Sequence, residues 1–379
     1  MDLRFNEQQE ILRTMARKFL VSELPKSKIK EIEESEEGHS TEVWRKMAAL
    51  GWMGLIIPED YGGMGYSFQD LTVLLEEMGR NICPGPFFCT AMSALTILDR
   101  GTEAQKKRFL PKIANGELIV TNDIMENEGL TEDILEASSS NSGYVINGTR
   151  LFVEMAHIAD YFLCTASTKD ENSKEEGMTL FILDSSSSNI CCNIIPTIGM
   201  NKLCEVEFNH IFVPQENILG ELNNGRVIVE KAIEKSVIAK CAESIGAMQA
   251  VMEMTVNYSK ERIQYDKPIG SFQALQFIMA NMWVAIETSR YLVYEAAWME
   301  SEGIPCSKEA SMAKAIINEA YRDVAQWAVR LHGALGTTRE HDVSLYYRRS
   351  REAASSFGST DFHREKVFQA INAQHTSRR

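Results

Sequence analysis

The sequence predicts an α+β protein in which a β segment separates two helical ones. From Asn6 to about residue 116, apolar residues recur at three- and four-residue steps, which is typical of amphipathic helices. Between about 117 and 224 the apolar segments become short, β-branched or aromatic, and Asn, Gly, Ser and Asp bound them. The helical period then returns in runs at 226–258, 271–301, 308–335 and near 362–373. This order, without alternating strand and helix units, argues against a doubly wound dinucleotide fold.

These changes of pattern place three domains at residues 1–116, 117–224 and 225–379. In the first domain, helices fit residues 40–49 and 68–78, separated by Pro58 and by a glycine-rich run at 62–65. In the second, strands fit residues 143–148, 161–164, 178–183 and 206–209.

Charge and composition argue against a nucleic-acid-binding, membrane-spanning or secreted protein. The 379 residues carry 39 Lys and Arg against 53 Asp and Glu, a formal charge of −14, which argues against nucleic acid as a partner. No run approaches the ~20 apolar residues of a membrane span, and the N-terminus is too polar for a signal peptide. The eight cysteines show no C-x-x-C spacing. We therefore expect a cytoplasmic protein with reduced thiols, no membrane partner and no metal.

Five motifs follow one another in a fixed order along the chain. They are LGWMGLIIPEDYGGMG (50–65), GTEAQK with LP and GE (101–117), FNHIFVP with NILG (208–220), RIQYDKPIGSFQ (262–273) and LHGALG (331–336). In this order and spacing they resemble the acyl-CoA dehydrogenases. The phosphate loops G-x-G-x-x-G and G-x-x-x-x-G-K do not occur in the sequence.

The resemblance implies an N-terminal helical domain, a central β barrel and a C-terminal four-helix bundle. It also implies FAD between barrel and bundle, with a neighbouring subunit's bundle closing over the pyrophosphate. The implied reaction removes the α-proton of an acyl-CoA thioester with a carboxylate base while the β-hydride passes to the flavin. Such a weakly acidic proton needs a well-placed base, and the flavin supplies the hydride acceptor.

The chain departs from this family at both usual positions of the base. Gly358 stands where a glutamate is expected in a Y-E-G-T turn, and Ser236 with Val237 occupies the alternative position on the first bundle helix. Asp361 and Glu154 are weak candidates for a displaced base. Asp361 has a simpler explanation as a helix N-cap.

The expected cofactor face is altered on the β side and better preserved on the bundle side. The segment 125–132 keeps only Glu126 of the family signature, and Phe152-Val153-Glu154 replaces W-I-T, which puts a carboxylate where a threonine would meet the flavin. A reduced anionic flavin would repel that charge. The resemblance assigns FAD contacts to Arg262, Gln264, Tyr265, Gln273, Arg330, Gly333 and Thr360.

Three hypotheses follow from these departures. The leading one is a degenerate subunit of a heteromeric acyl-CoA dehydrogenase that shares FAD with an intact second subunit in a heterotetramer. The segment 331–351 carries this hypothesis, because it resembles enzymes that oxidise steroid and other bulky acyl-CoAs. The second is an active homomeric enzyme with a displaced carboxylate base. The third is a non-catalytic assembly scaffold. His332 is interpreted as a packing residue.

Overall fold

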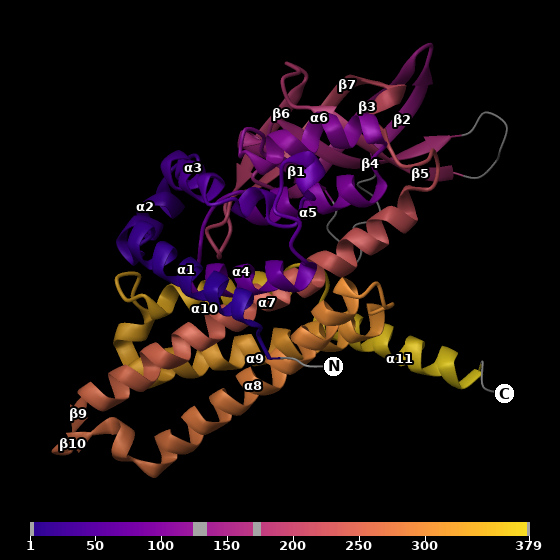
Figure 1. The fold of residues 1–379 in the computed structure, drawn as a ribbon. Helices are drawn as coiled ribbons and strands as arrows, with labels where there is room; N and C mark the ends of the chain where they lie inside the picture. The colour runs from indigo at the N-terminus through magenta and orange to yellow at the C-terminus, as the bar shows by residue number, and fades with distance from the viewer. Residues whose placement is uncertain (1–3, 124–134, 170–175, 377–379) are drawn as a thin grey trace. The chain divides into compact units, whose positions relative to one another are not determined.

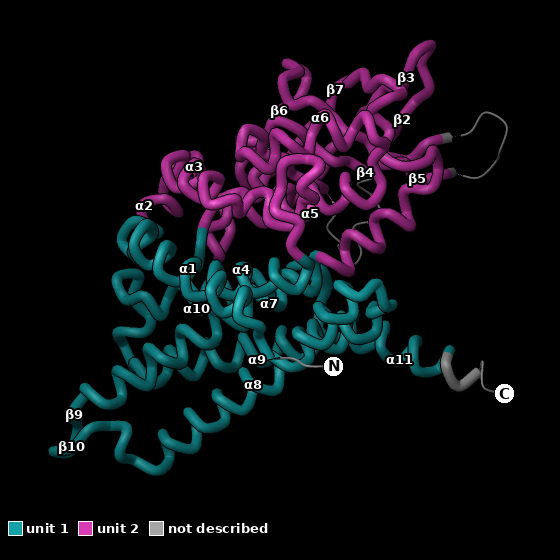
Figure 2. The backbone as a smooth tube through the Cα atoms, in the orientation of Figure 1, with its two compact units in different colours: residues 1–29, 67–83, 236–379 teal, residues 30–66, 84–235 magenta. Residues whose placement is uncertain are grey.

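A computed structural model of the chain describes residues 4–123, 135–169 and 176–376. The chain forms two compact units, each assembled from separate stretches of sequence (Figure 2). Unit 1 comprises residues 1–29, 67–83 and 236–379, and unit 2 comprises residues 30–66 and 84–235. The helices α2 (Lys26–Glu34) and α7 (Gly225–Glu261) pass from one unit to the other. The three domain boundaries expected from the sequence remain a prediction.

Unit 1 is helical (Figure 1). Besides most of α7 it contains α1 (Glu7–Glu23), α4 (Phe68–Asn81), α8 (Gln273–Ser301), α9 (Ser307–His332), α10 (Val343–Ser355) and α11 (Thr360–Thr376). A two-stranded hairpin of β9 (Ile263–Gln264) and β10 (Lys267–Pro268) joins α7 to α8. One short 3₁₀ turn, Ile269–Ser271, follows this hairpin. Another, Gly333–Thr337, follows α9.

The first helices begin at side-chain caps that the sequence contains. Asn6 and Gln9 form a reciprocal capping box at the start of α1, and Ser67 and Asp70 form another at the start of α4. These caps satisfy backbone N–H groups that would otherwise lack a partner in the first turn. They explain why the helix expected over 68–78 is confirmed and begins at Phe68.

Two glycines allow α4 and α7 to cross at close range. A Cβ atom on Gly79 would lie 1.8 Å from the carbonyl oxygen of Glu243, and one on Gly246 would lie 1.7 Å from that of Glu76. Any larger residue would force the helices apart, since real Cβ atoms do not approach an oxygen so closely. The crossing fixes where the middle of α7 lies against the end of α4.

Unit 2 combines helices with a sheet. Its helices are α3 (Thr41–Ala49), α5 (Phe87–Arg100) and α6 (Glu103–Ala114). The 3₁₀ turns are Trp52–Gly54, Glu59–Tyr61, Ala156–Ile158 and Gln215–Asn217. The strands are β1 (Val120–Asn122), β2 (Leu135–Ser140), β3 (Gly143–Glu154), β4 (Tyr161–Lys169), β5 (Glu176–Asp184), β6 (Ile190–Ile195), β7 (Leu203–Pro214) and β8 (Ile218–Leu219).

The sheet is mixed and runs in the order β6-β7-β3-β2-β4-β5-β8, with β1 paired to β4. The pairs β2–β4 and β1–β4 are parallel, and the other ladders are antiparallel. Phe162, Phe181 and Phe208 lie in its fully buried apolar core. Over the described residues the ladder remains open between β6 and β8, so the β domain is confirmed and a closed barrel is not.

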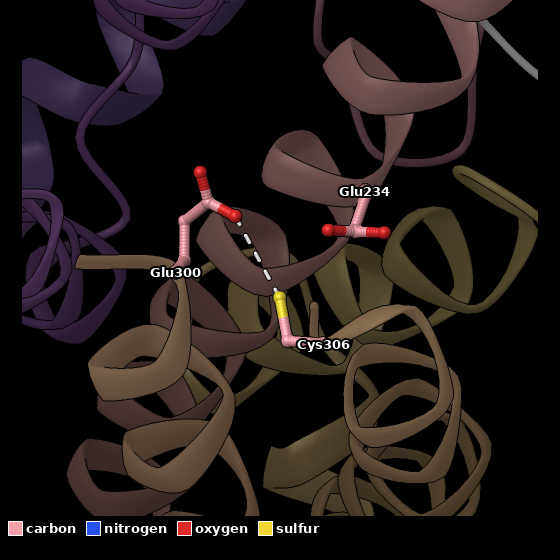
Figure 3. A group of neighbouring side chains, drawn as sticks. All are labelled: Glu234, Glu300 and Cys306. Carbon is pink, nitrogen blue, oxygen red and sulfur yellow. Dashed lines mark hydrogen bonds between the residues drawn. The ribbon is translucent and has the colours of Figure 1, made fainter. Parts of the chain in front are cut away.

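None of the helices in the described ranges is long and apolar enough to cross a membrane. All eight cysteines are free thiols, and five of them are buried. Figure 3 includes Cys306, whose Sγ donates a hydrogen bond of 3.6 Å to Oε2 of Glu300 within unit 1.

Candidate functional site

Gly358 lies buried in the loop between α10 and α11, with φ at +101°. Its carbonyl oxygen accepts a hydrogen bond of 3.3 Å from Nδ2 of Asn318 on α9. A Cβ atom at this position would lie 2.7 Å from Cδ1 of Phe362 and 2.9 Å from Nε2 of His363. Side chains of L-residues rarely adopt this backbone conformation, and here the space is also filled. The loop is therefore built around glycine and has no room for a carboxylate at position 358.

The alternative base position lies on α7, where Ser236 and Val237 are both buried. A serine hydroxyl stays protonated near neutral pH and cannot take the part of a carboxylate. Neither position expected from the resemblance therefore carries a carboxylate in unit 1.

Asp361 lies at the second position of α11, and its side chain is 94% exposed. Its nearest charged partner is Arg364, at 3.6 Å between Oδ1 and Nη1. The expectation that Asp361 caps α11 is wrong, because Oγ of Ser359 accepts the hydrogen bond from the backbone N–H of Phe362. The carboxylate of Asp361 thus faces solvent and leaves the buried loop without a base.

Glu154 ends β3 in unit 2 and is half-buried. The backbone around it is irregular, because Phe152 and Met155 have φ of +63° and +54° and the β3–β7 register shifts between Arg150 and Val153. Such a bulge redirects side chains at the end of a strand. The expected signature residues 125–132, with Glu126, lie outside the described residues.

Four charged side chains meet inside unit 1 and line a cavity of about 30 Å³. Lys240 Nζ lies 2.7 Å from Oε2 of Glu243 and 3.6 Å from Oε1 of Glu352, and Arg349 Nη1 lies 2.9 Å from Oε2 of Glu352. Burial opposes the charged form of Glu352, but Arg349 and Lys240 outweigh it and hold its pKa below the usual value. We call Lys240, Glu243, Arg349 and Glu352 the ionic cluster.

Lys314 on α9 adds a third cation near the ionic cluster. It is 1% exposed, and its Nζ donates a hydrogen bond of 2.6 Å to the carbonyl of Ala353 on α10. Burial lowers its pKa from 10.5 to about 8. Sequence reasoning missed both Lys240 and Lys314, because a lysine within an apolar helical run gives no sign of its partners.

The predicted FAD contacts of the hairpin region are solvent-exposed. Arg262, Gln264 and Gln273 are exposed, and Tyr265 is 87% exposed. Tyr265 and Asp266 have φ of +53° and +62°, which turns the chain sharply between β9 and β10. The hairpin that carries these residues joins the C-terminal end of α7 to the N-terminal end of α8 (Figure 1).

A second group of predicted FAD contacts, Gly333 and Arg330, lies at the same end of unit 1. The rings of Tyr258 on α7 and His332 on α9 stack at 4.4 Å, next to Gly333. Gly333 has φ of +63° and open space where a Cβ would lie. Arg330 is exposed and lies over the Trp327 ring at 4.8 Å. His332 is 3% exposed, which agrees with its interpretation as a packing residue.

The predicted site residues therefore form two groups. On α7, the alternative base position Ser236 lies 22 residues before Tyr258, which stacks on His332 at the hairpin end. This separation corresponds to roughly 33 Å at 1.5 Å per residue. Gly358 and Thr360 lie in and just after the loop that Asn318 contacts, whereas Arg262, Gln264, Tyr265 and Gly333 lie at the hairpin end. One copy of unit 1 brings the members of each group together but keeps the two groups apart.

Comparisons with known proteins identify the family. Sequence models of the N-terminal, middle and C-terminal domains of acyl-CoA dehydrogenases match residues 6–117, 128–211 and 223–371. A short-chain specific acyl-CoA dehydrogenase of Clostridium acetobutylicum is 31% identical, over 92% of this chain and 93% of that protein. The chain belongs to the acyl-CoA dehydrogenase family.

Two further relatives extend this assignment. The caffeyl-CoA reductase-Etf complex subunit CarC of Acetobacterium woodii is 30% identical over 92% of this acyl-CoA dehydrogenase homologue and 93% of that subunit. The solved butyryl-CoA dehydrogenase of Megasphaera elsdenii superposes with a TM-score of 0.89 at 26% identity, covering 98% of this chain and all of that one.

Membership of the acyl-CoA dehydrogenase family implies FAD as cofactor, and the hairpin end of unit 1 fits part of it. The exposed guanidinium of Arg262 suits a diphosphate, and the open backbone at Gly333 allows close approach of a ligand. Arg262 and Gln264 supply donors there, beside the exposed carboxylate of Asp266 in the same hairpin.

Proposed function

We propose that this acyl-CoA dehydrogenase homologue is a subunit that lacks its own catalytic base and acts with a second subunit that retains it. The observation that carries the proposal is the loop at Gly358, where Phe362 and His363 occupy the space next to a glycine with φ of +101°. Removal of a thioester α-proton needs a base within hydrogen-bond reach. In unit 1, both family positions lack one.

The same proposal gives the hairpin end a role in the partner's site. Arg262, Gln264 and Tyr265 follow the C-terminal end of α7, beyond Tyr258, which lies roughly 33 Å along that helix from Ser236. A flavin held near Gly358 of one chain therefore takes its pyrophosphate contacts from the hairpin end of another chain. FAD supplies the hydride acceptor when bound, and this chain's exposed donors hold the diphosphate of the FAD that an intact subunit uses.

A relative supports an assembly of different chains. The caffeyl-CoA reductase subunit named above works, by its name, in a complex with an electron-transferring flavoprotein. We infer that the present chain likewise functions in a complex, with a second acyl-CoA dehydrogenase subunit as its partner and an acyl-CoA thioester as the substrate.

A homomeric enzyme with a displaced base is the second candidate, and Glu154 favours it more than Asp361 does. Glu154 is half-buried beside a strained turn in unit 2, whereas the Asp361 carboxylate is 94% exposed. A base must be positioned and partly shielded from water to work efficiently.

Co-expression with a family member that keeps the Y-E-G-T glutamate tests the proposal. We expect a stable mixed complex with fewer FAD than chains, and turnover that disappears when the partner's glutamate is changed to glutamine. Asp361→Asn in this chain should leave that turnover unchanged. Stoichiometric FAD and turnover by the isolated chain, abolished by Glu154→Gln, would establish the homomeric enzyme instead.

A further inference from the structure

Three large exposed side chains lie along one face of α8 in unit 1. Phe277, Val284 and Tyr291 follow one another at intervals of seven residues, and they are 60, 61 and 57% exposed. Because seven residues make nearly two turns of an α-helix, the three side chains point from the same side of it. We call Phe277, Val284 and Tyr291 the α8 seam.

The first half of α8 carries no charge. Residues 273–286, almost four turns, contain no Asp, Glu, Lys or Arg, although 24% of the whole chain is charged. The inner side of this helix is already covered, since Met282 and Ile286 are 2 and 0% exposed. A helix that is apolar on its outer as well as its inner face normally has protein on both sides. We therefore expect another chain to cover the α8 seam.

The seven-residue interval indicates what kind of structure covers the seam. Large apolar side chains at this interval pack between the side chains of a second helix, because the repeat keeps one stripe facing that helix. Ala280 is exposed between Phe277 and Val284, and its small side chain allows a neighbouring helix to approach closely. This pattern favours a helix as the occupant.

The charged groups beside the seam do not oppose its burial. A groove of about 690 Å³ between α1, α4, α7 and α8 borders the seam, and Tyr291 belongs to both. Charged side chains of the groove pair with one another: Nε of Arg290 lies 3.3 Å from Oε1 of Glu287, and Nη2 of Arg17 lies 2.6 Å from Oε1 of Glu77. Covering this side of α8 would therefore bury paired charges, and burial is most costly for unpaired ones.

The start of the α8 seam adjoins the proposed FAD contacts. The hairpin of β9 and β10 leads through the 3₁₀ turn Ile269–Ser271 into α8 (Figure 1). Nε2 of Gln276 donates a hydrogen bond of 2.9 Å to the carbonyl of Gly270, which ties the first turn of α8 to this 3₁₀ turn. Phe277, the next residue, begins the seam. A chain whose FAD the hairpin holds therefore lies next to the seam.

We propose that the α8 seam is the docking surface for a helix of the second acyl-CoA dehydrogenase subunit. This inference rests on the proposed function, because it takes as the occupant the subunit whose FAD the hairpin holds. In this arrangement the seam holds that subunit along α8 while the hairpin contacts its FAD.

One charge in the middle of the seam tests the inference in the co-expressed complex. Val284→Glu should weaken the association of the two subunits at least about tenfold, because a helix packed there would bury an unpaired carboxylate. Val21→Glu is the matched control, since Val21 on α1 is 62% exposed and lies outside both the seam and the groove. It should change the dissociation constant less than about twofold. Sedimentation of the complex over a dilution series measures both constants.

A photoreactive benzophenone side chain in place of Tyr291 identifies the occupant, even if Val284→Glu prevents folding. It should cross-link to a helical segment of the second subunit. An unchanged dissociation constant in folded Val284→Glu, or cross-links from position 291 only to another copy of this chain, would overturn this inference alone. Absence of any mixed complex with the wild-type chain would overturn the proposed function with it.

Discussion

Nε2 of His363 donates a hydrogen bond of 2.8 Å to the backbone carbonyl of Phe357, next to Gly358. The imidazole is 1% exposed and occupies space that a side chain at position 358 would need. Position 358 is therefore crowded by His363 as well as by Phe362. A Gly358→Glu substitution would place a side chain on a backbone with positive φ, and its Cβ would clash with the ring of His363.

Gly358→Ala should destabilise the protein more than the same change at another positive-φ glycine. Gly303 is a matched control, because it has φ of +68° and open space around a Cβ. Both changes cost about 1 kcal/mol from the backbone, and overpacking at Gly358 adds about 1–3 kcal/mol. Equal midpoints of urea unfolding for the two variants would contradict the crowded loop.

Glu352→Gln should destabilise the ionic cluster strongly. It leaves Lys240 and Arg349 buried with less compensating charge, which costs about 3–5 kcal/mol, whereas Glu42→Gln at the exposed pair with Lys46 should cost less than about 1 kcal/mol.

The lowered pKa of Glu352 also predicts how the stability of the fold changes with pH. Its pKa in the folded chain lies below 4.5, so its ionised form stabilises the fold above that pH and the stabilisation is lost as pH falls through the lowered pKa. Thermal unfolding of wild type and Glu352→Gln should therefore converge on acidification below pH 4.5. A gap that stays constant would contradict the ion pairs.

The difference in stability between the wild type and Lys314→Met should change with pH between about 8 and 10.5. The folded chain holds the Lys314 proton less tightly than the unfolded chain, whose pKa is 10.5 against about 8. Stability of the wild type should therefore rise relative to the variant between pH 8 and 10.5, by about 3 kcal/mol at most. Unfolding midpoints of both proteins across this range measure it, and a flat difference would contradict the burial of the charge.

Arg262→Ala should lower the FAD content of the complex without lowering the stability of this chain. Arg262 is exposed, so its removal leaves no buried group unsatisfied. Arg226→Ala is a suitable control, because Arg226 is an exposed arginine at the other end of α7. The absorbance ratio of flavin to protein checks both variants, and unchanged flavin in Arg262→Ala would remove the proposed role of the hairpin.

Much of the fold could be predicted because it follows from local pattern. The runs expected at 226–258, 271–301 and 308–335 correspond to α7, α8 and α9. The helix α10 was not predicted, because Arg348, Arg349 and Arg351 break its apolar pattern. Its inward residue Glu352 pairs with Arg349 of the same helix and with Lys240, more than a hundred positions away. Such long-range pairing is not visible in a single sequence.

The candidate site was predictable only as a set of positions. The sequence could show that Gly358 replaces a glutamate, since the motif order fixes the alignment. It could not show that His363 fills the space, that Ser359 rather than Asp361 caps α11, or that the hairpin end lies a helix length from the loop. These depend on backbone angles and on contacts between distant segments.

Flavin reduction by acyl-CoA under anaerobic conditions tests the central claim most directly. The isolated chain, supplied with FAD, is mixed with a mixture of thioesters, and flavin absorbance near its visible maximum is followed. A chain without a base should leave the flavin oxidised, while the complex with an intact subunit should bleach it. Bleaching by the isolated chain at the rate of the complex would contradict the account.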